Sequence, residues 1–476
     1  MENSVKSNIS FAVLSQVITI LKNIFVSLAL PKILPVDGFG YWQLFILYAS
    51  FVGIFHFGIT DGMYLRISKS KNEDISPKQI KGQFRLLVFI DFFISLILIG
   101  ILSLCNLQGD RFIVMIMIGV YLVFANIEWY LGHLFQAIEK GKTYSNAIII
   151  STIFFIIAFL IFAILGIDDY RIYVLAYIVT TIINVAFLMF KAKFVMKEAT
   201  ASIDETFDIT KKDIKIGIFL TVANFSNLLI LGMTKQAIDL FFGLTTFSKV
   251  SFAISLINFF LLFLSQVGLV ILPFLNNQKE DDKKTSYQTI SSFLSYFLML
   301  AYVAYVPLAI FVKLWLPNYV ESLKYLGILL PICMYDGYMK ILYSTYLNLL
   351  GKTRKLLYIN CISIVIVTIS AILGGVIFDS INIILIGTVI SIIIQCIISE
   401  IYITKLLEIK KHKYFIINLI STIAFLLVSN IFNYLITFVI ALCMYIIYLI
   451  LDRQAVLTII KMVVKKERKD SINIRS

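Results

Sequence analysis

Apolar stretches about as long as a bilayer is thick recur from one end of the chain to the other. Each is long enough for a helix to cross a hydrocarbon core of about 30 Å. The chain is 60% hydrophobic and only 14% charged, whereas globular domains carry about 25% charged residues. We therefore predict an all-α polytopic membrane protein with fourteen transmembrane helices, at residues 9–30, 39–62, 84–105, 112–135, 145–166, 171–190, 214–234, 246–272, 288–312, 323–347, 356–378, 382–404, 414–430 and 434–451.

The positions of Lys and Arg predict how these spans are oriented. If the N-terminus is cytoplasmic, only seven of the 41 Lys and Arg residues fall in external connections, which satisfies the positive-inside rule. We expect a multi-pass protein of the bacterial cytoplasmic membrane with both termini in the cytoplasm. The same bias accounts for the net charge of +13 without a nucleic-acid partner. The basic tail is expected to attract anionic membrane lipids.

Similar segments recur at nearly one offset, which predicts an internal duplication. Gly141 and Gly351 close two similar turns, LFQAIEKGKT and STYLNLLGKT, and lie 210 positions apart. Gly58 and Gly268 repeat that offset. Because six spans separate the copies, both halves enter the membrane in the same direction, as parallel transporter repeats do. We expect two pseudo-symmetric six-helix lobes plus two C-terminal helices: an N-lobe at 1–190, a cytoplasmic linker at 191–213, a C-lobe at 214–404, helices 13 and 14 at 405–451, and a basic cytoplasmic tail at 452–476.

Polar side chains follow one face of the first, seventh and eighth spans. Lys22 lies near the middle of the first span, where a lysine is costly unless it faces a cavity or a partner. The polar neighbours favour a watered substrate cavity. Hydrogen bonding between helices is the alternative for each Ser or Thr, and a carboxylate partner is the alternative for Lys22. The residues expected to line the cavity are Ser15, Thr19, Lys22, Asn23, Asn224, Asn227, Lys249, Ser255 and Asn258.

Two opposite charges lie one helical turn apart in the tenth span. Asp336 and Lys340 are spaced i, i+4, so they share a helix face and can pair. The repeat offset places Glu128, in the fourth span, on or within two residues of Asp336. Charges at membrane depth are functional candidates. We interpret these three residues as an ion-coupling site, with a static clamp inside the second lobe as the alternative.

Motifs of enzymes and metal proteins are incomplete in this sequence. The two GKT triplets lack the first glycine of a phosphate-binding loop. None of the three histidines has a neighbour at metal-ligand spacing. We expect no catalytic residue, no metal site and no cofactor, with coupling to Na⁺ or H⁺ left open. The five cysteines, which have no CxxC spacing, are expected to be small core residues: Cys105, Cys333, Cys361, Cys396 and Cys443.

Four segments resemble the polysaccharide flippases of the multidrug/oligosaccharidyl-lipid/polysaccharide (MOP) exporter superfamily, which translocate O-antigen or capsule repeat units. They are LPVDGFGYWQL (34–44), FGITDGMYLRIS (57–68), NLLILGMTKQAIDLFFG (227–243) and YLNLLGKTRKLLYIN (346–360). The third segment has Asp239 where these proteins commonly have an aspartate. Two departures are Pro35, where glycine is usual, and Lys249, where tyrosine is usual.

The resemblance implies two six-helix lobes with helices one, two, seven and eight lining the cavity. It implies transport of an undecaprenyl-pyrophosphate-linked oligosaccharide to the external leaflet, alongside other polysaccharide assembly proteins. A multidrug or cation antiporter and a lipid II flippase are alternatives within the superfamily, and a polysaccharide polymerase is the alternative from another class. We interpret Lys22 as the residue that holds the pyrophosphate, with Lys249 taking over at the outer mouth of the cavity.

Overall fold

The computed structural model describes residues 2–69, 76–104, 108–276, 280–409, 413–431 and 434–451, and these form helices and short connections without any strand. Ten helices in this described part are long and apolar enough to cross a membrane. Two shorter apolar helices, Phe415–Ser429 and Tyr434–Ile447, follow near the C-terminus. The predicted all-helical membrane fold is confirmed at this level. The basic tail at 452–476 and Cys105 lie outside the described residues.

The chain divides into two compact units. The first comprises Met1–Lys235 and Gly243–Ser251, and the second comprises Gln236–Phe242 and the chain from Phe252 onward. The long helix α9 (Ile203–Asn276) contributes to both units and is interrupted at Gly243, where φ is 80° and ψ is 173°. Glycine reaches this backbone conformation at little steric cost. The seventh and eighth expected spans thus lie on either side of one glycine kink. The lobe boundaries expected from the duplication stay a prediction.

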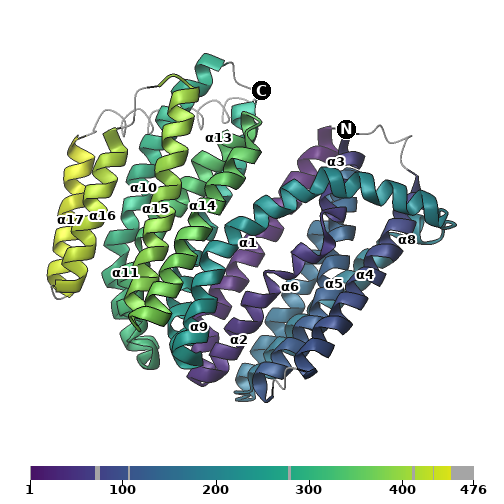
Figure 1. Ribbon diagram of the computed structural model, residues 1–476, viewed down its shortest axis with the longest axis horizontal. Helices are drawn as coiled ribbons and strands as arrows, with labels where there is room; N and C mark the ends of the chain where they lie inside the picture. The colour runs from purple at the N-terminus through teal and green to yellow at the C-terminus, as the bar shows by residue number, and fades with distance from the viewer. Residues whose placement is uncertain are drawn as a thin grey trace. The chain divides into compact units, whose positions relative to one another are not determined.

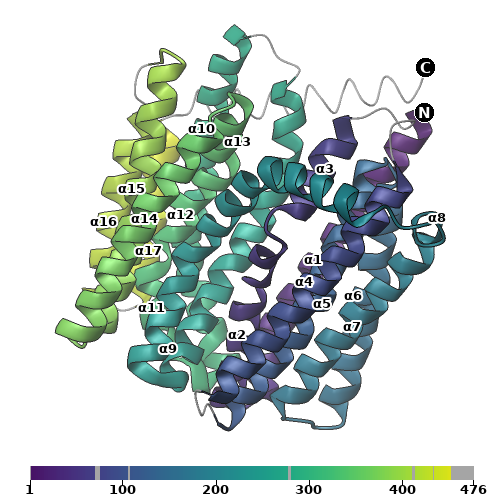
Figure 2. The same ribbon diagram turned by 45° about the vertical axis from the view of Figure 1, so that its right-hand side comes forward.

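The first unit is a helical bundle in which α5 has a central place. The helix α5 packs against α4 and α7, and α1 packs against α6; Figures 1 and 2 show α4 to α7 running side by side. The buried core between these helices is apolar and includes Leu87, Leu131 and Leu134. The elements are α1 (Glu2–Ile33), α2 (Val36–Ala49), η1 (Val52–His56), α3 (Ile59–Lys69), α4 (Pro77–Leu104), α5 (Asp110–Ala137), α6 (Gly141–Ile164), α7 (Tyr170–Lys191) and α8 (Lys193–Met196).

The second expected span is broken rather than continuous. The helix α2 is followed by the short 3-10 helix η1, and Phe57 then adopts a left-handed conformation with φ 48° before α3 begins. The start of α3 lies directly against α9. A Cβ atom on Gly62 would lie 2.0 Å from the backbone oxygen of Asp213, and one on Gly217 would lie 2.1 Å from that of Gly58. These glycines therefore allow the two helices to approach through their backbones.

The second unit is built on the packing of α14 against α15 and of α10 against α17. The elements are α10 (Glu280–Trp315), η3 (Pro317–Tyr319), α11 (Ser322–Leu329), α12 (Pro331–Tyr338), the π-helix η4 (Met339–Tyr343), α13 (Ser344–Leu349), α14 (Thr353–Ile372), the π-helix η5 (Leu373–Ile377), α15 (Ile381–Leu406), α16 (Lys413–Ile431) and α17 (Tyr434–Leu451). The tenth expected span thus consists of α11, α12, η4 and α13 in succession.

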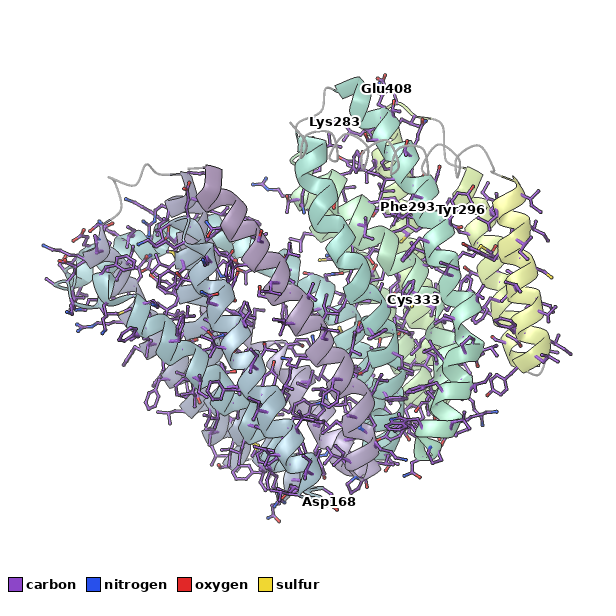
Figure 3. All side chains as sticks on the ribbon, turned by 180° about the vertical axis from the view of Figure 1, so that it is seen from behind. Asp168, Lys283, Phe293, Tyr296, Cys333 and Glu408 are labelled. Carbon is purple, nitrogen blue, oxygen red and sulfur yellow. The ribbon has the colours of Figure 1, made fainter. Side chains whose placement is uncertain are left out.

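Three side chains labelled in Figure 3 mark positions along the length of the second unit. Lys283 and Glu408 lie at one end of the unit, and Cys333 lies nearer the middle of its length (Figure 3). Cys333 and Cys396 are buried, as expected of core residues. The expectation is wrong for Cys361 and Cys443, which are exposed because they lie on outward faces of α14 and α17.

Candidate functional site

Lys22 of α1 lies against aromatic rings from two other helices of the first unit. Its Nζ atom is 5.5 Å from the ring centroid of Phe155 on α6 and 5.4 Å from that of Tyr177 on α7. Cation–π contacts of this kind contribute from about 0.5 to 2 kcal/mol, more as the cation loses water. The packing of α1 against α6 brings the lysine to these rings. Lys22 is half-buried, with a neighbourhood that is mainly aromatic.

A carboxylate completes the surroundings of Lys22. Glu128 on α5 interacts electrostatically with the lysine. The Nδ2 atom of Asn184 on α7 donates a hydrogen bond of 2.7 Å to Glu128 Oε1. We call the set Lys22, Glu128, Phe155, Tyr177 and Asn184 the lysine site. Glu128 is thus the carboxylate near Lys22, and a carboxylate partner for this lysine stays an alternative to a substrate cavity.

The hydroxyl groups that precede Lys22 on α1 are satisfied within their own helix. Ser15 Oγ donates to the carbonyl oxygen of Ala12, and Thr19 Oγ1 donates to that of Ser15, each at 2.8 Å. Ser and Thr commonly bond back to the preceding turn in this way. Ser15 is buried, whereas Thr19 and Asn23 are half-buried. These hydroxyls need neither water nor a second helix to satisfy their hydrogen bonds.

The other residues expected to line a cavity are distributed over both compact units. Asn224 and Asn227 are exposed on the part of α9 that belongs to the first unit. Lys249 is half-buried in the same unit. Ser255 and Asn258 are half-buried in the second unit. Their expected role in lining one cavity stays a prediction.

The ion pair predicted from the i, i+4 spacing is present in the second unit. Lys340 Nζ lies 2.8 Å from Asp336 Oδ2. The aspartate side chain is 10% exposed and the lysine side chain 36% exposed. The pair spans the junction between α12 and the π-helix η4, and such π-helical turns are frequent at functional sites. Its role in ion coupling stays a prediction, as does that of Glu128, which lies in the lysine site of the first unit.

Sequence reasoning missed a salt bridge that joins α3 to α9. Arg66 donates from Nε and Nη2 to the two carboxylate oxygens of Asp213, each at 2.9 Å. Gln83 on α4 accepts from the same guanidinium at 3.0 Å and donates to Asp213 at 2.8 Å. The side chain of Asp213 is completely buried. A bidentate pair with this added amide fixes one orientation of α3 on α9.

Two further buried carboxylates were also missed, although each is the lone acidic residue of an apolar span. Glu400 on α15 accepts a hydrogen bond of 2.5 Å from Tyr287 Oη. Asp91 on α4 accepts one of 2.8 Å from Asn126 on α5. In each carboxylate the second oxygen is buried without a hydrogen-bond partner in the described structure. A single carboxylate in an apolar run is the signal that could have identified both.

Comparisons with known proteins find similarity at the level of structure alone. No protein-family model matches the chain, and no curated protein matches its sequence. The structure is similar to that of the lipid II flippase MurJ in an inward closed conformation, with a TM-score of 0.69, 13% identity, and coverage of 94% of this chain and 99% of that one.

Multidrug transporters of the MATE family are also similar. An inward-facing MATE transporter of the MOP superfamily matches with a TM-score of 0.58 and 13% identity, over 88% of this chain and 98% of that one. A MATE protein in complex with MaL6 matches with a TM-score of 0.55 and 11% identity, over 89% of this chain and 97% of that one. The chain is thus a multi-pass membrane protein with the fold of MOP superfamily transporters.

Proposed function

We propose that this protein is a flippase for undecaprenyl-pyrophosphate-linked oligosaccharide repeat units, acting in O-antigen or capsule biosynthesis. The observation that carries the proposal is the MOP transporter fold, shared over 94% of the chain with a structure described as a lipid II flippase. That neighbour's substrate, as its description names it, is a lipid-linked molecule. The four segments that resemble polysaccharide flippases support the same substrate class. The proposal includes fourteen crossings of the cytoplasmic membrane, two pseudo-symmetric lobes and cytoplasmic termini.

In this proposal the lysine site binds the pyrophosphate. A lysine ammonium is a compact point charge that suits phosphate groups, and the rings of Phe155 and Tyr177 exclude water from one side of it. Glu128 competes with the pyrophosphate for Lys22. If Glu128 takes up a proton as the substrate arrives, its side chain no longer attracts Lys22 and no longer repels the pyrophosphate. Lys249 then takes over the pyrophosphate at the external side.

A multidrug or cation antiporter is the second candidate, and one observation favours it. A carboxylate beside aromatic rings, as Glu128 is, suits an organic cation. The two candidates make opposite demands on the lysine site. A flippase needs the positive charge of Lys22, whereas a cation antiporter needs the negative charge of Glu128 and tolerates the loss of the lysine charge.

The test is to locate lipid-linked repeat units in a strain that lacks the protein. We expect them to accumulate on the cytoplasmic leaflet and to reach the external leaflet when the wild-type protein is restored. Lys22→Ala should fail to restore export at wild-type membrane abundance, whereas the matched variant Lys22→Arg, which keeps the charge, should restore much of it. Detection of external repeat units in the deletion strain would contradict a flippase and favour a polymerase, which consumes units already outside.

A further inference from the structure

Asp91 is a carboxylate in the middle of a membrane-spanning helix, and no described cation pairs with it. It lies near the midpoint of α4, about 20 Å from either end at about 1.5 Å per residue. Its side chain is fully buried. An isolated ionised carboxylate at such a depth is strongly disfavoured. Among the described residues, Asn126 is the side chain that hydrogen-bonds to Asp91, and no ion pair involves Asp91.

The side chains of Asp91 and Asn126 share one hydrogen bond and leave one acceptor oxygen on each side chain unsatisfied. Asn126 Nδ2 donates to Asp91 Oδ1 at 2.8 Å. The remaining oxygens, Asp91 Oδ2 and Asn126 Oδ1, are both buried without a partner in the described structure. Two acceptors cannot bond to each other, but a protonated carboxyl group carries one O–H donor. A proton on Asp91 Oδ2 gives the pair the donor that it lacks, and an acid and an amide can then form a cyclic pair with two hydrogen bonds.

A metal cation fits these residues less well than a proton. Hard cations such as Ca²⁺ and Mg²⁺ take about six or more oxygen ligands. The described residues contain no cluster of three or more His, Cys, Asp or Glu side chains that could hold a metal. A proton needs only one donor position and one acceptor, and Asp91 with Asn126 offers both.

The same amide connects Asp91 to the break in the second span. Asn126 Nδ2 also lies 3.4 Å from the carbonyl oxygen of Val52, the first residue of η1. The helix η1 packs closely on α5: a Cβ atom on Gly53 would lie 2.5 Å from the ring of Trp129. Loss of the proton from Asp91 would leave a buried charge and two acceptors without a donor. The nearby backbone of η1, already unwound, is the element that can rearrange to supply a donor.

Other titratable groups on α4 and on the elements around it have hydrogen-bond, ion-pair or cation–π partners other than Asp91, or are exposed. On the elements that pack against α4, Glu128 bonds to Asn184, Tyr130 to the carbonyl of Ile80, and His56 to the amide of Gly58. Lys193 lies over the ring of Phe190, Asp213 pairs with Arg66, and Glu205 bonds to Gln79. On α4 itself, Lys81 bonds to the carbonyl of Glu198 and Arg85 is exposed.

We infer that Asp91 carries an exchangeable proton, paired with Asn126, and that its protonation state sets the conformation of the broken segment η1. This inference concerns a site distinct from the lysine site and does not depend on the proposed substrate. It describes a two-state element whose equilibrium a proton biases. The proton moves between Asp91 Oδ2 and water, and no other bond is made or broken.

The test is infrared spectroscopy of the purified full-length protein, combined with hydrogen–deuterium exchange. We expect a protonated-carboxyl carbonyl band that shifts with ¹³C-aspartate labelling and weakens as the pH is raised, because the group then loses its proton. Amide exchange in residues 50–58 should increase over the same pH range. The band should persist in Glu128→Gln, the control for another buried carboxylate of the first unit.

Two variants at position 91 identify the band. Asp91→Asn should remove it and keep exchange in 50–58 slow at every pH, because an amide can replace the protonated acid in the cyclic pair. Asp91→Glu should keep a band that no longer responds to the aspartate label, which serves if the amide variant does not fold. The inference is overturned by the absence of an Asp91 band, by a band that does not change with pH, or by a band that Na⁺ removes at constant pH.

Discussion

The two compact units pair their charged side chains in different ways. In the first unit, Arg66 pairs with Asp213 and Arg171 with Asp110, and each pair links two separate helices. In the second unit, Asp336 pairs with Lys340 on consecutive turns of one helical run. A pair that links two helices breaks when those helices separate. A pair within one run moves with it and does not respond to the packing of its neighbours.

This difference bears on which charges can couple transport to an ion. Coupling requires that ion binding and helix movement favour the same state. Charges that link helices, as in the first unit, meet this requirement directly. Asp336 would meet it only if an incoming ion changed its partner and the π-helical turn beside it. The predictions below test the contrast between pairs that link helices and a pair within one helix.

The largest effect is expected from Arg66→Met. The variant leaves the completely buried Asp213 carboxylate without its cation, and breaking a buried pair in this way costs about 3–5 kcal/mol. The thermal unfolding of the purified protein in detergent measures the loss. The matched change in the second unit, Lys340→Met, should cost less, because the pair is partly exposed and water can reach the Asp336 carboxylate more easily than that of Asp213.

A second variant shows whether the loss comes from the stranded charge. Arg66→Met with Asp213→Asn removes the buried charge and should recover most of the stability. If Arg66→Met and Lys340→Met are equally stable, pairs that link helices hold no energetic advantage in this protein and the contrast between the units fails.

The next effect is expected on transport, from Lys22→Ala. Loss of one charged hydrogen-bonding group to a phosphate costs about 1.5–3 kcal/mol, which corresponds to a reduction in export of about tenfold or more. Lys22→Arg keeps the charge and should retain much more surface polysaccharide. Equal, wild-type levels in both variants, at equal membrane abundance, would remove Lys22 from the mechanism.

The sequence predicted what depends on neighbouring residues and missed what depends on helix packing. The apolar spans and the Asp336–Lys340 pair follow from composition and spacing within one segment. The bond between Asn184 and Glu128 joins positions 56 apart, and that between Arg66 and Asp213 joins positions 147 apart. Such partners depend on which helices lie side by side. The polar stripe on α1 was visible as a periodicity, but its hydroxyls bond to their own helix.

A smaller effect is expected from Gly62→Ala, at the contact between α3 and α9. The added Cβ atom would lie 2.0 Å from the backbone oxygen of Asp213, so the two helices must separate. Such overpacking costs about 1–3 kcal/mol, measured by thermal unfolding. Gly100→Ala on α4 is the control, because nothing lies within 4 Å of its new methyl group, and it should be neutral or stabilising. Equal behaviour of the two variants would contradict the close approach of α3 and α9.

The smallest effect on stability is expected from exchanging the charges of the second unit, in Asp336→Lys with Lys340→Asp. Pairs at i, i+4 contribute about 0.2–0.5 kcal/mol on an exposed helix, and the order with the acid first is the better one. Reversal should therefore cost little if the pair is only a clamp, and polysaccharide export should remain normal. If Asp336 binds the coupling ion, reversal places a lysine at the buried position, and export should fail at wild-type membrane abundance.

The neutral pair Asp336→Asn with Lys340→Gln further separates a clamp from an ion site, because it removes the carboxylate without placing a lysine at the buried position. If Asp336 binds the coupling ion, the neutral and reversed pairs should fail alike, since both lack a carboxylate at position 336. Normal export by both would assign coupling to the carboxylates of the first unit.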